Sequence, residues 1–239
     1  MKLPIASFVI PSYNSVTFLP HAVKSALEQS FKEIEVIIVN DASTDMTFQY
    51  LDWLVKKDDS RIRIINNNEN KGRSESRNIG NTSACGQFIF VLDADDLAAP
   101  NRVDLSLKKL ANVPFVYGSA TIMDALGNKV SEIRSDVFNL DNAISTKQNR
   151  IVHSSVAYSK SFAMNNPYEP GEVARLGIDD WAQQIRAATN GVKFDYIPQT
   201  ICAYRSHSGT ITNSRNMKEV NEFKDKYISE RLHTDLVTA

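Results

Sequence analysis

Apolar runs and amphipathic segments alternate over the first 110 residues of the chain. Four short apolar runs are typical of strands buried on both faces: residues 5–10, 35–39, 62–65 and 88–92. Apolar residues at helical spacing follow each run, at residues 16–29, 44–57 and 73–84 and from Pro100 onward. Strand and helix therefore alternate four times, which predicts a parallel sheet with right-handed crossovers.

The pattern changes after residue 112. A strand at 115–123, a turn at 124–128 and a returning strand at 130–134 predict an antiparallel hairpin. Residues 135–150 are polar and irregular, and 165–177 resemble a loop. We expect further strands at 151–158 and 194–204, the second interrupted at Pro198, and helices at 179–189 and from about Arg215. We therefore predict one α/β domain at 1–212, built as a single Rossmann-like mixed sheet with helices on both faces. Its halves are 1–112 and 113–212, and a helical tail follows at 213–239.

Each of the first four predicted strands ends in a polar cluster, at residues 12–14, 40–45, 66–71 and 93–96. The carboxyl ends of parallel strands share one edge of the sheet, and ligands bind outside that edge. The last cluster holds Asp93, Asp95 and Asp96, which repel one another, so folding alone gives no reason to gather them. A divalent cation gives a reason, because hard cations take oxygen ligands. The alternative is an acidic turn that caps the next helix.

Composition narrows the classes of function. The 239 residues are 42% hydrophobic and 23% charged, and the net charge of −1 gives no global field that would attract nucleic acid. Two cysteines are too few for a disulfide framework or a cysteine-based zinc site, which favours a reducing compartment. No apolar run approaches the roughly 20 residues of a membrane span. We expect a cytoplasmic protein, and the tail helix leaves contact with a partner or with the inner face of a membrane open.

Six motifs occur in this order along the chain: FVIPSYN (8–14), VNDASTD (39–45), NKGRSESRNIG (70–80), LDADD (92–96), IDDW (178–181) and YRSHSGT (204–210). Together they resemble the motifs of the family 2 glycosyltransferases, inverting enzymes of the GT-A fold. The resemblance covers residues 3–212, and its motifs are specific in combination and weak singly. It implies the GT-A fold, with a nucleotide-sugar bound by the half at 1–112, most often a UDP-sugar, together with Mn²⁺ or Mg²⁺. The acceptor would be a glycan, a lipid-linked intermediate or a protein, and the commonest setting in the family is bacterial polysaccharide assembly.

The resemblance also implies roles for individual residues. Nucleotide contacts are expected from Pro11, Tyr13, Asn14, Asp41, Lys71, Arg77, Asp93 and Ala94. Contacts with the metal or the diphosphate are expected from Asp95, Asp96 and His207. Asp180 is expected to be the general base. Asp179 replaces the more usual Glu, which leaves the choice within this pair slightly open.

The chemistry agrees with such a site. Inverting transfer is an in-line displacement at the anomeric carbon, so a carboxylate that takes the acceptor proton helps by about 10² to 10⁴. A cation offsets the charge that grows on the leaving diphosphate. Structural roles stay open for the same residues. Asp179 and Asp180 could complement the dipole at a helix start, and Asp41 could be a turn residue. His207 could be a surface loop histidine, and Arg77 could form a surface salt bridge.

Two other functions stay open: a module that holds a nucleotide-sugar without turnover, and a sugar nucleotidyltransferase. The second would need a glycine-rich, basic phosphate loop after the first strand, and Pro-Ser-Tyr-Asn-Ser at 11–15 does not supply one. The chain has no Gln-x-x-Arg-Trp segment, which the processive synthases of the family carry. We therefore expect a single addition rather than polymerisation.

Overall fold

A mixed sheet runs through the molecule and carries the candidate site at one edge. The computed structural model describes residues 3–210 and 215–234, and the side chains up to residue 231. Within these residues the sheet has nine strands in the order β3-β2-β1-β4-β8-β6-β9-β5, with β7 paired to β6. The strands are β1 (Ala6–Ser12), β2 (Ile34–Asn40), β3 (Ile62–Asn66), β4 (Phe88–Val91), β5 (Leu97–Ala98), β6 (Phe115–Met123), β7 (Lys129–Ile133), β8 (Ala157–Ser159) and β9 (Phe194–Arg205).

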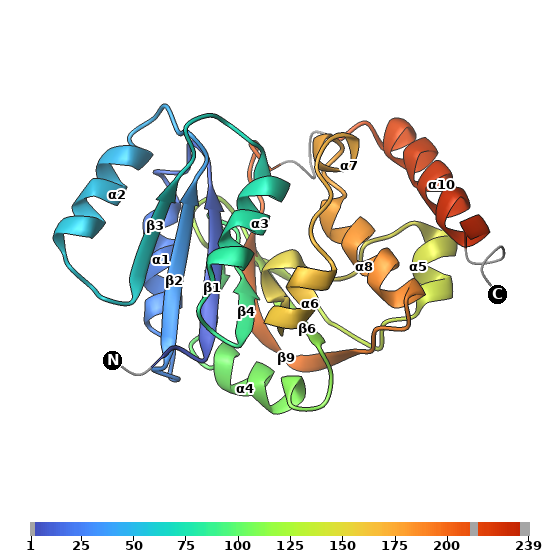
Figure 1. The fold of residues 1–239 in the computed structure, drawn as a ribbon, viewed down its shortest axis with the longest axis horizontal. Coiled ribbons are helices and arrows are strands. Elements are labelled where there is room, and N and C mark those ends of the chain that lie inside the picture. The colour runs from blue at the N-terminus through green and yellow to red at the C-terminus, as the bar shows by residue number, and fades with distance from the viewer. Residues whose placement is uncertain (1–2, 211–214, 235–239) are drawn as a thin grey trace.

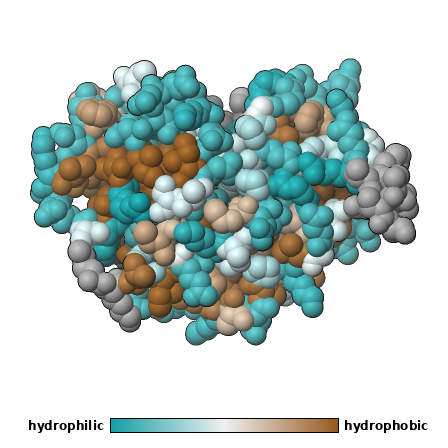
Figure 2. Space-filling view, in the orientation of Figure 1, coloured by the Kyte–Doolittle hydropathy of each residue, from teal (hydrophilic) through white to brown (hydrophobic). Residues whose placement is uncertain are grey.

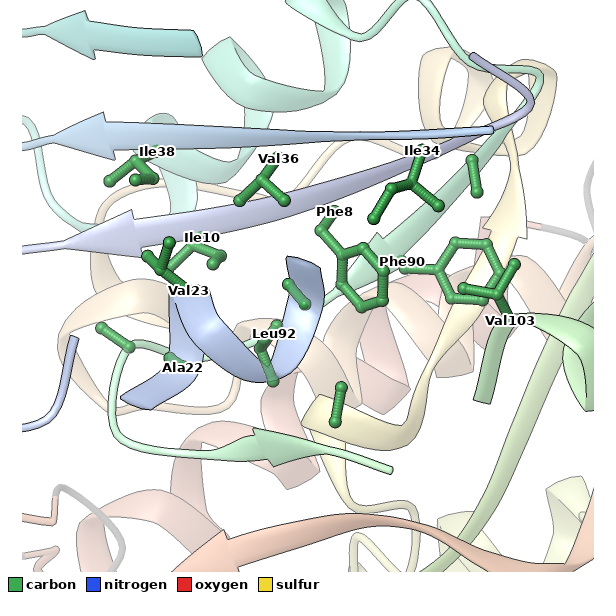
Figure 3. Packing of buried hydrophobic residues seen from close by; sticks show 14 of the residues in the cluster. Phe8, Ile10, Ala22, Val23, Ile34, Val36, Ile38, Phe90, Leu92 and Val103 are labelled. Atoms are coloured by element: carbon green, nitrogen blue, oxygen red, sulfur yellow. The ribbon is translucent and has the colours of Figure 1, made fainter. Parts of the chain in front are cut away.

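The first half is the parallel unit that the alternation predicts. β1 pairs in parallel with β2 and β4, and β2 pairs in parallel with β3. Helices α1 (Leu19–Leu27), α2 (Thr47–Lys56) and α4 (Arg102–Leu110) pack on one face, and α3 (Arg73–Ser83) and α6 (Lys160–Asn165) pack on the other (Figure 1). Figure 3 shows this core, in which Val23 of α1 lies beside Ile10 and Phe90 lies between Phe8 and Val103. The predicted α/β class and mixed sheet with helices on both faces are confirmed.

The first strand continues through Pro11 to Ser12, two residues beyond the predicted end at residue 10. Ser12 accepts a hydrogen bond from Asp41 N–H of the segment after β2, so the backbone of Pro11 faces the opposite neighbour, β4. The pairing of β1 with β4 ends at Val9 and Val91. Pro11 therefore lies where no ladder bond would need its missing N–H.

The strands β7 and β9 lie beside β6 in the second half. β7 pairs with β6 antiparallel as the predicted hairpin, and β9 pairs with the other edge of β6 in parallel. The register between β6 and β9 shifts at Gly118 and Ser119, opposite Pro198, whose carbonyl accepts a hydrogen bond from the Ser119 hydroxyl. The predicted interruption at Pro198 is thus a bulge inside one continuous strand.

The second half differs from the sequence prediction in its loops. Two segments predicted as irregular contain the short helices α5 (Leu140–Thr146) and α7 (Glu172–Arg175), and residues 151–158 contain a 3-10 turn, η1 (His153–Ser155), before β8. The helix predicted at 179–189 is α8 (Asp179–Thr189), and the tail forms α10 (Met217–Thr234). Apolar residues of α5, α7, α8 and α10 pack into a separate cluster around Trp181. These short helices form because tertiary packing buries their apolar faces, which local pattern cannot reveal.

The edge strand β3 is less covered than β1 and β2, whose residues are buried except Pro11. Figure 2 shows hydrophobic residues at the surface in the region where Figure 1 places β3 and α2. Phe48, Trp53 and Val55 of neighbouring α2 are also at least half exposed. The helices therefore cover this end of the sheet incompletely.

Candidate active site

A cleft of about 600 Å³ opens at the carboxyl edge of the parallel strands. Residues following β1, β2 and β4 line it, together with the first turns of α3 and α8 and the segment after β9. Its volume is within the range of small-molecule sites, and its place is the edge at which open α/β sheets bind ligands. The structure therefore brings the polar strand ends together, except the cluster at 66–71, whose residues do not line the cleft.

Asp41 is held by a ring of donors at the cleft wall. Its carboxylate accepts hydrogen bonds from Lys71 N–H, Gly72 N–H and Asn67 Nδ2, each at 2.8 Å, and the residue is 3% exposed. A carboxylate has about four acceptor positions, so this one keeps capacity for a further donor from a ligand. Lys71 contributes only its backbone here, because its side chain is exposed and lies outside the cleft lining.

The residues after β1 form the neighbouring part of the wall. Pro11, Tyr13 and Asn14 line the cleft, and Tyr13 is 49% exposed. Asn14 adopts a left-handed backbone with φ of 48°, and its Oδ1 accepts hydrogen bonds from the N–H groups of Thr44 and Asp45. Much of the Asn14 side chain is therefore engaged in joining the loops after β1 and β2. Ala94 lines the same cleft.

Arg77 joins the two halves of the domain. It is 6% exposed, and its guanidinium donates to Asp93 Oδ1 at 2.7 Å and to Asp179 Oδ2 at 2.5 Å. The guanidinium also lies over the Tyr168 ring, 5.4 Å from its centroid. Burial opposes ionisation of Asp93, but Arg77 and His153 together hold the pKa of that carboxyl well below its usual range. Arg77 thus links Asp93 after β4 to Asp179 at the start of α8, and its guanidinium is occupied by these two carboxylates.

Asp95 and His207 meet at the floor of the cleft, although 112 positions separate them in the chain. The distance between Asp95 Oδ2 and His207 Nε2 is 3.1 Å. Burial and the charge of Asp93 raise the pKa of Asp95. Asp96 lies outside the cleft lining: it is 1% exposed and accepts a hydrogen bond from Arg205 N–H at 2.7 Å. Of the predicted metal-binding trio, the structure therefore brings two residues to the cleft and buries the third against β9.

The Asp95–His207 pair suits a divalent cation that shares its shell with a ligand. No group of three or more acidic, histidine or cysteine residues that could hold a metal occurs in the described parts of the chain. Octahedral Mg²⁺ takes ligands at about 2.1 Å, so adjacent ligands at right angles stand about 3 Å apart. The two side chains hydrogen-bond to one another, and their 3.1 Å separation also matches this spacing. Substrate phosphates commonly supply further ligands of such ions.

The two carboxylates at the start of α8 have different surroundings. Asp179 is 2% exposed and pairs with Arg77 and with Arg73, whose Nε lies 3.2 Å from Asp179 Oδ1. Asp180 lines the cleft, and its carboxylate accepts from Asn149 Nδ2 at 2.6 Å and from Trp181 N–H at 2.8 Å. Asp179 is therefore neutralised by two cations, whereas Asp180 faces the cleft with no cationic partner among the described residues.

Several cleft residues escaped the sequence analysis. Arg73, Asn149, His153 and Arg215 all line the cleft. Arg73 lies within the motif at 70–80, so its position was a usable signal. Asn149 lies in a segment predicted as irregular and His153 in one predicted as a strand, and only the packing of the second half brings them to the site.

Comparison with known proteins agrees with this architecture. The model of the family described as glycosyl transferase family 2 matches residues 7–165. An uncharacterised glycosyltransferase of Methanocaldococcus jannaschii is 28% identical over 211 residues, which are 86% of this chain and 72% of that protein. WfgD of Escherichia coli, described as a UDP-Glc:alpha-D-GlcNAc-diphosphoundecaprenol beta-1,3-glucosyltransferase, is 31% identical over 123 residues, 50% of this chain and 47% of that protein.

Among solved structures, the mannosyltransferase PcManGT of Pyrobaculum calidifontis, in complex with GDP-Man and Mn²⁺, superposes with a TM-score of 0.67 at 16% identity. The match covers 89% of this chain and 60% of that one. The chain therefore belongs to glycosyl transferase family 2, and its fold is the GT-A fold of these enzymes. It spans about half the length of the E. coli relative. No helix within the described ranges is long and apolar enough to cross a membrane.

Proposed function

We propose that this glycosyltransferase moves a sugar from a UDP-sugar to a hydroxyl acceptor with inversion, one residue at a time and with the help of Mn²⁺ or Mg²⁺. The observation that carries this proposal is the unequal pair at the start of α8. Asp180 faces the cleft without a cation, while Asp179 beside it is neutralised by Arg73 and Arg77. A carboxylate that faces the cleft and forms no ion pair within the described residues is what a general base requires.

The donor is assigned to the wall formed by the half at 1–112. Asp41 keeps acceptor capacity for a base N–H, and Tyr13 presents a half-exposed ring beside it. WfgD uses UDP-glucose by its description, which favours uridine. The archaeal neighbour holds GDP-mannose, so a guanosine donor is the competing outcome of the nucleotide test below.

In the proposed reaction, Asp180 takes the proton of the acceptor hydroxyl as its oxygen attacks the anomeric carbon and the bond to the diphosphate breaks. Asn149 and the N–H of Trp181 orient the Asp180 carboxylate. Asp95 and His207 would hold the cation, which when bound offsets the negative charge on the leaving nucleoside diphosphate. Arg77 keeps Asp93 and the start of α8 at a fixed separation, so that donor and base stay aligned.

The acceptor half at 113–212 carries the base, and we propose that its acceptor belongs to bacterial polysaccharide or glycoconjugate assembly. WfgD acts on a lipid-linked sugar by its description, which supports this setting. Residues of this half line the cleft from the segments at 149–153 and 177–180, across from Tyr13 and Asp41 of the donor wall.

Nucleotide titration tests the donor site. Calorimetry with UDP, GDP, dTDP and CDP, each with and without Mn²⁺, should give metal-dependent binding of UDP, and Asp95→Ala should abolish it. Asp104→Ala is the matched control, because Asp104 is an acid in the first turn of α4 outside the cleft. Preference for another base would overturn the UDP assignment, and no binding by any nucleotide would overturn the donor site.

A second experiment tests the base. Asp180→Asn should lower turnover by about 10² to 10⁴ while donor affinity persists. Proton NMR of the product should show an anomeric configuration opposite to that of the donor. Full turnover in Asp180→Asn, or retention of configuration, would refute the assigned mechanism. Donor binding without transfer to any acceptor by the unmodified protein would point instead to a binding module.

A further inference from the structure

The arginines of the cleft differ in the charges that surround them. Three arginines line it: Arg73, Arg77 and Arg215. Arg73 and Arg77 pair with Asp179, and Arg77 also pairs with Asp93. Among the described residues, Arg215 donates to one acceptor, the carbonyl of Gly177, and forms no ion pair. Its Nε is buried without a hydrogen-bond partner, as are the Nε atoms of Arg73 and Arg77. Within the described residues, Arg215 is therefore the arginine of the cleft with no carboxylate beside it.

Arg215 stands on the side of the cleft that carries the base. Gly177 lies just before α8, two residues ahead of Asp179, and Arg215 itself lies just before α10. Figure 1 places α7 and α10 at the right of the molecule and β1–β3, which carry the proposed donor wall, at the left. Arg215 is thus anchored to the segment that presents Asp180, while the Asp95–His207 pair offers the donor diphosphate a separate cation site.

A guanidinium has five N–H donors in a planar fork that matches the oxygens of phosphate or carboxylate. The single carbonyl bond of Arg215 leaves most of these donors available. Buried polar groups are normally hydrogen-bonded. The Nε atoms of all three arginines lack a partner, but within the described residues only Arg215 also lacks an ion pair, so a ligand anion would complete its set. Asp179 does not oppose an anion strongly here, because two arginines already neutralise it.

We propose that Arg215 binds an anionic group of the acceptor, a phosphate or a carboxylate, next to the hydroxyl that Asp180 deprotonates. The inference rests on the proposed function and deepens it, because it assigns the acceptor a negative charge close to its reacting sugar. Arg215 acts in binding and orientation, and the proton transfer stays with Asp180.

Equilibrium binding tests this with three probes of one alkyl chain length. They are an N-acetylglucosaminyl diphosphate ester, a glucuronic acid glycoside and a neutral N-acetylglucosamine glycoside, titrated calorimetrically with UDP and Mn²⁺ present. The unmodified protein should bind one anionic probe more tightly than the neutral probe. Tighter binding of the diphosphate ester identifies phosphate as the recognised group, and tighter binding of the glucuronic acid glycoside identifies carboxylate. Arg215→Gln should weaken that binding about 10- to 100-fold, the range expected for a hydrogen bond to a charged group. Arg215→Lys should retain part of it.

The controls separate recognition from folding and from donor binding. Arg175→Gln removes a positive charge from the same side of the molecule, but Arg175 pairs with Glu172 and Glu219 outside the cleft, so it should change nothing. UDP affinity should be equal in Arg215→Gln and the unmodified protein. Equal binding of charged and neutral probes, binding of none of them, or an equal loss of UDP affinity in Arg215→Gln would each overturn the proposal. Failure of the proposed function gives a different result, because no nucleotide would then bind the unmodified protein. That result would also refute the role of Arg215 in acceptor binding.

Discussion

Replacing Arg77 by methionine removes the buried bridge between Asp93 and Asp179. The guanidinium donates to both carboxylates and is 6% exposed. Removing one partner of a buried ion pair costs about 3–5 kcal/mol, because an uncompensated charge stays behind. That is a large part of the roughly 5–15 kcal/mol that stabilises a typical domain. Urea unfolding of Arg77→Met should therefore show a midpoint far below that of the unmodified chain.

The partners of the two acids are unequal, which allows a sharper test. Asp179 keeps Arg73 at 3.2 Å after the change, whereas Asp93 keeps only His153, at 3.6 Å. The unpaired charge therefore falls mainly on Asp93. The double variant Arg77→Met/Asp93→Asn should recover more stability than Arg77→Met/Asp179→Asn.

The matched control is Arg175→Met. Arg175 also pairs with two carboxylates, Glu172 and Glu219, but does so at the surface, where solvent screens the charges. Its unfolding midpoint should stay close to that of the unmodified chain. Equal midpoints for Arg77→Met and Arg175→Met, or equal recovery in the two double variants, would refute the reasoning.

Three further predictions concern packing, pH and the base. In Gly80→Ala, the added Cβ would clash with Val9 Cγ1, so the close contact of α3 with β1 should open and cost about 1–3 kcal/mol despite the better helix propensity of alanine. Thr82→Ala, at an exposed position of α3, is the control, and equal unfolding stability of both variants would contradict the packing argument. Burial lowers the pKa of Lys224 to about 8, whereas an unfolded chain holds that proton up to about 10.4. The folded chain thus binds fewer protons between these values, so the unmodified protein should gain stability relative to Lys224→Met as the pH rises from 7 to 10, and parallel curves would refute this. Asn149→Ala should lower kcat with little change in donor KM, because Asn149 orients Asp180, and a change confined to KM would exclude that role.

Much of the site could be predicted from the sequence because its parts stand at the ends of short buried strands. The carboxyl ends of β1, β2 and β4 share one edge, so Tyr13, Asp41 and Asp95 had to lie near one another once the parallel order was recognised. The pairing of Asp95 with His207 agrees with their joint assignment to the metal or diphosphate. Asp96 shows the limit: a run of three neighbouring acids does not say which one turns into the protein to meet Arg205 N–H.

The sequence by itself determined the alternation of strands and helices, the mixed sheet and the edge that carries the cleft. These follow from local periodicity and from the fixed handedness of crossovers, which neighbouring residues encode. Only the tertiary structure decided that Asp179 is neutralised while Asp180 faces the cleft. It also decided that Arg77 is buried between two carboxylates and is not a surface residue. Asp179 meets Ser74 and Arg77 from a segment about 100 residues away in the chain. Their pairing depends on how the short helices of the second half pack, which no local pattern of the chain specifies.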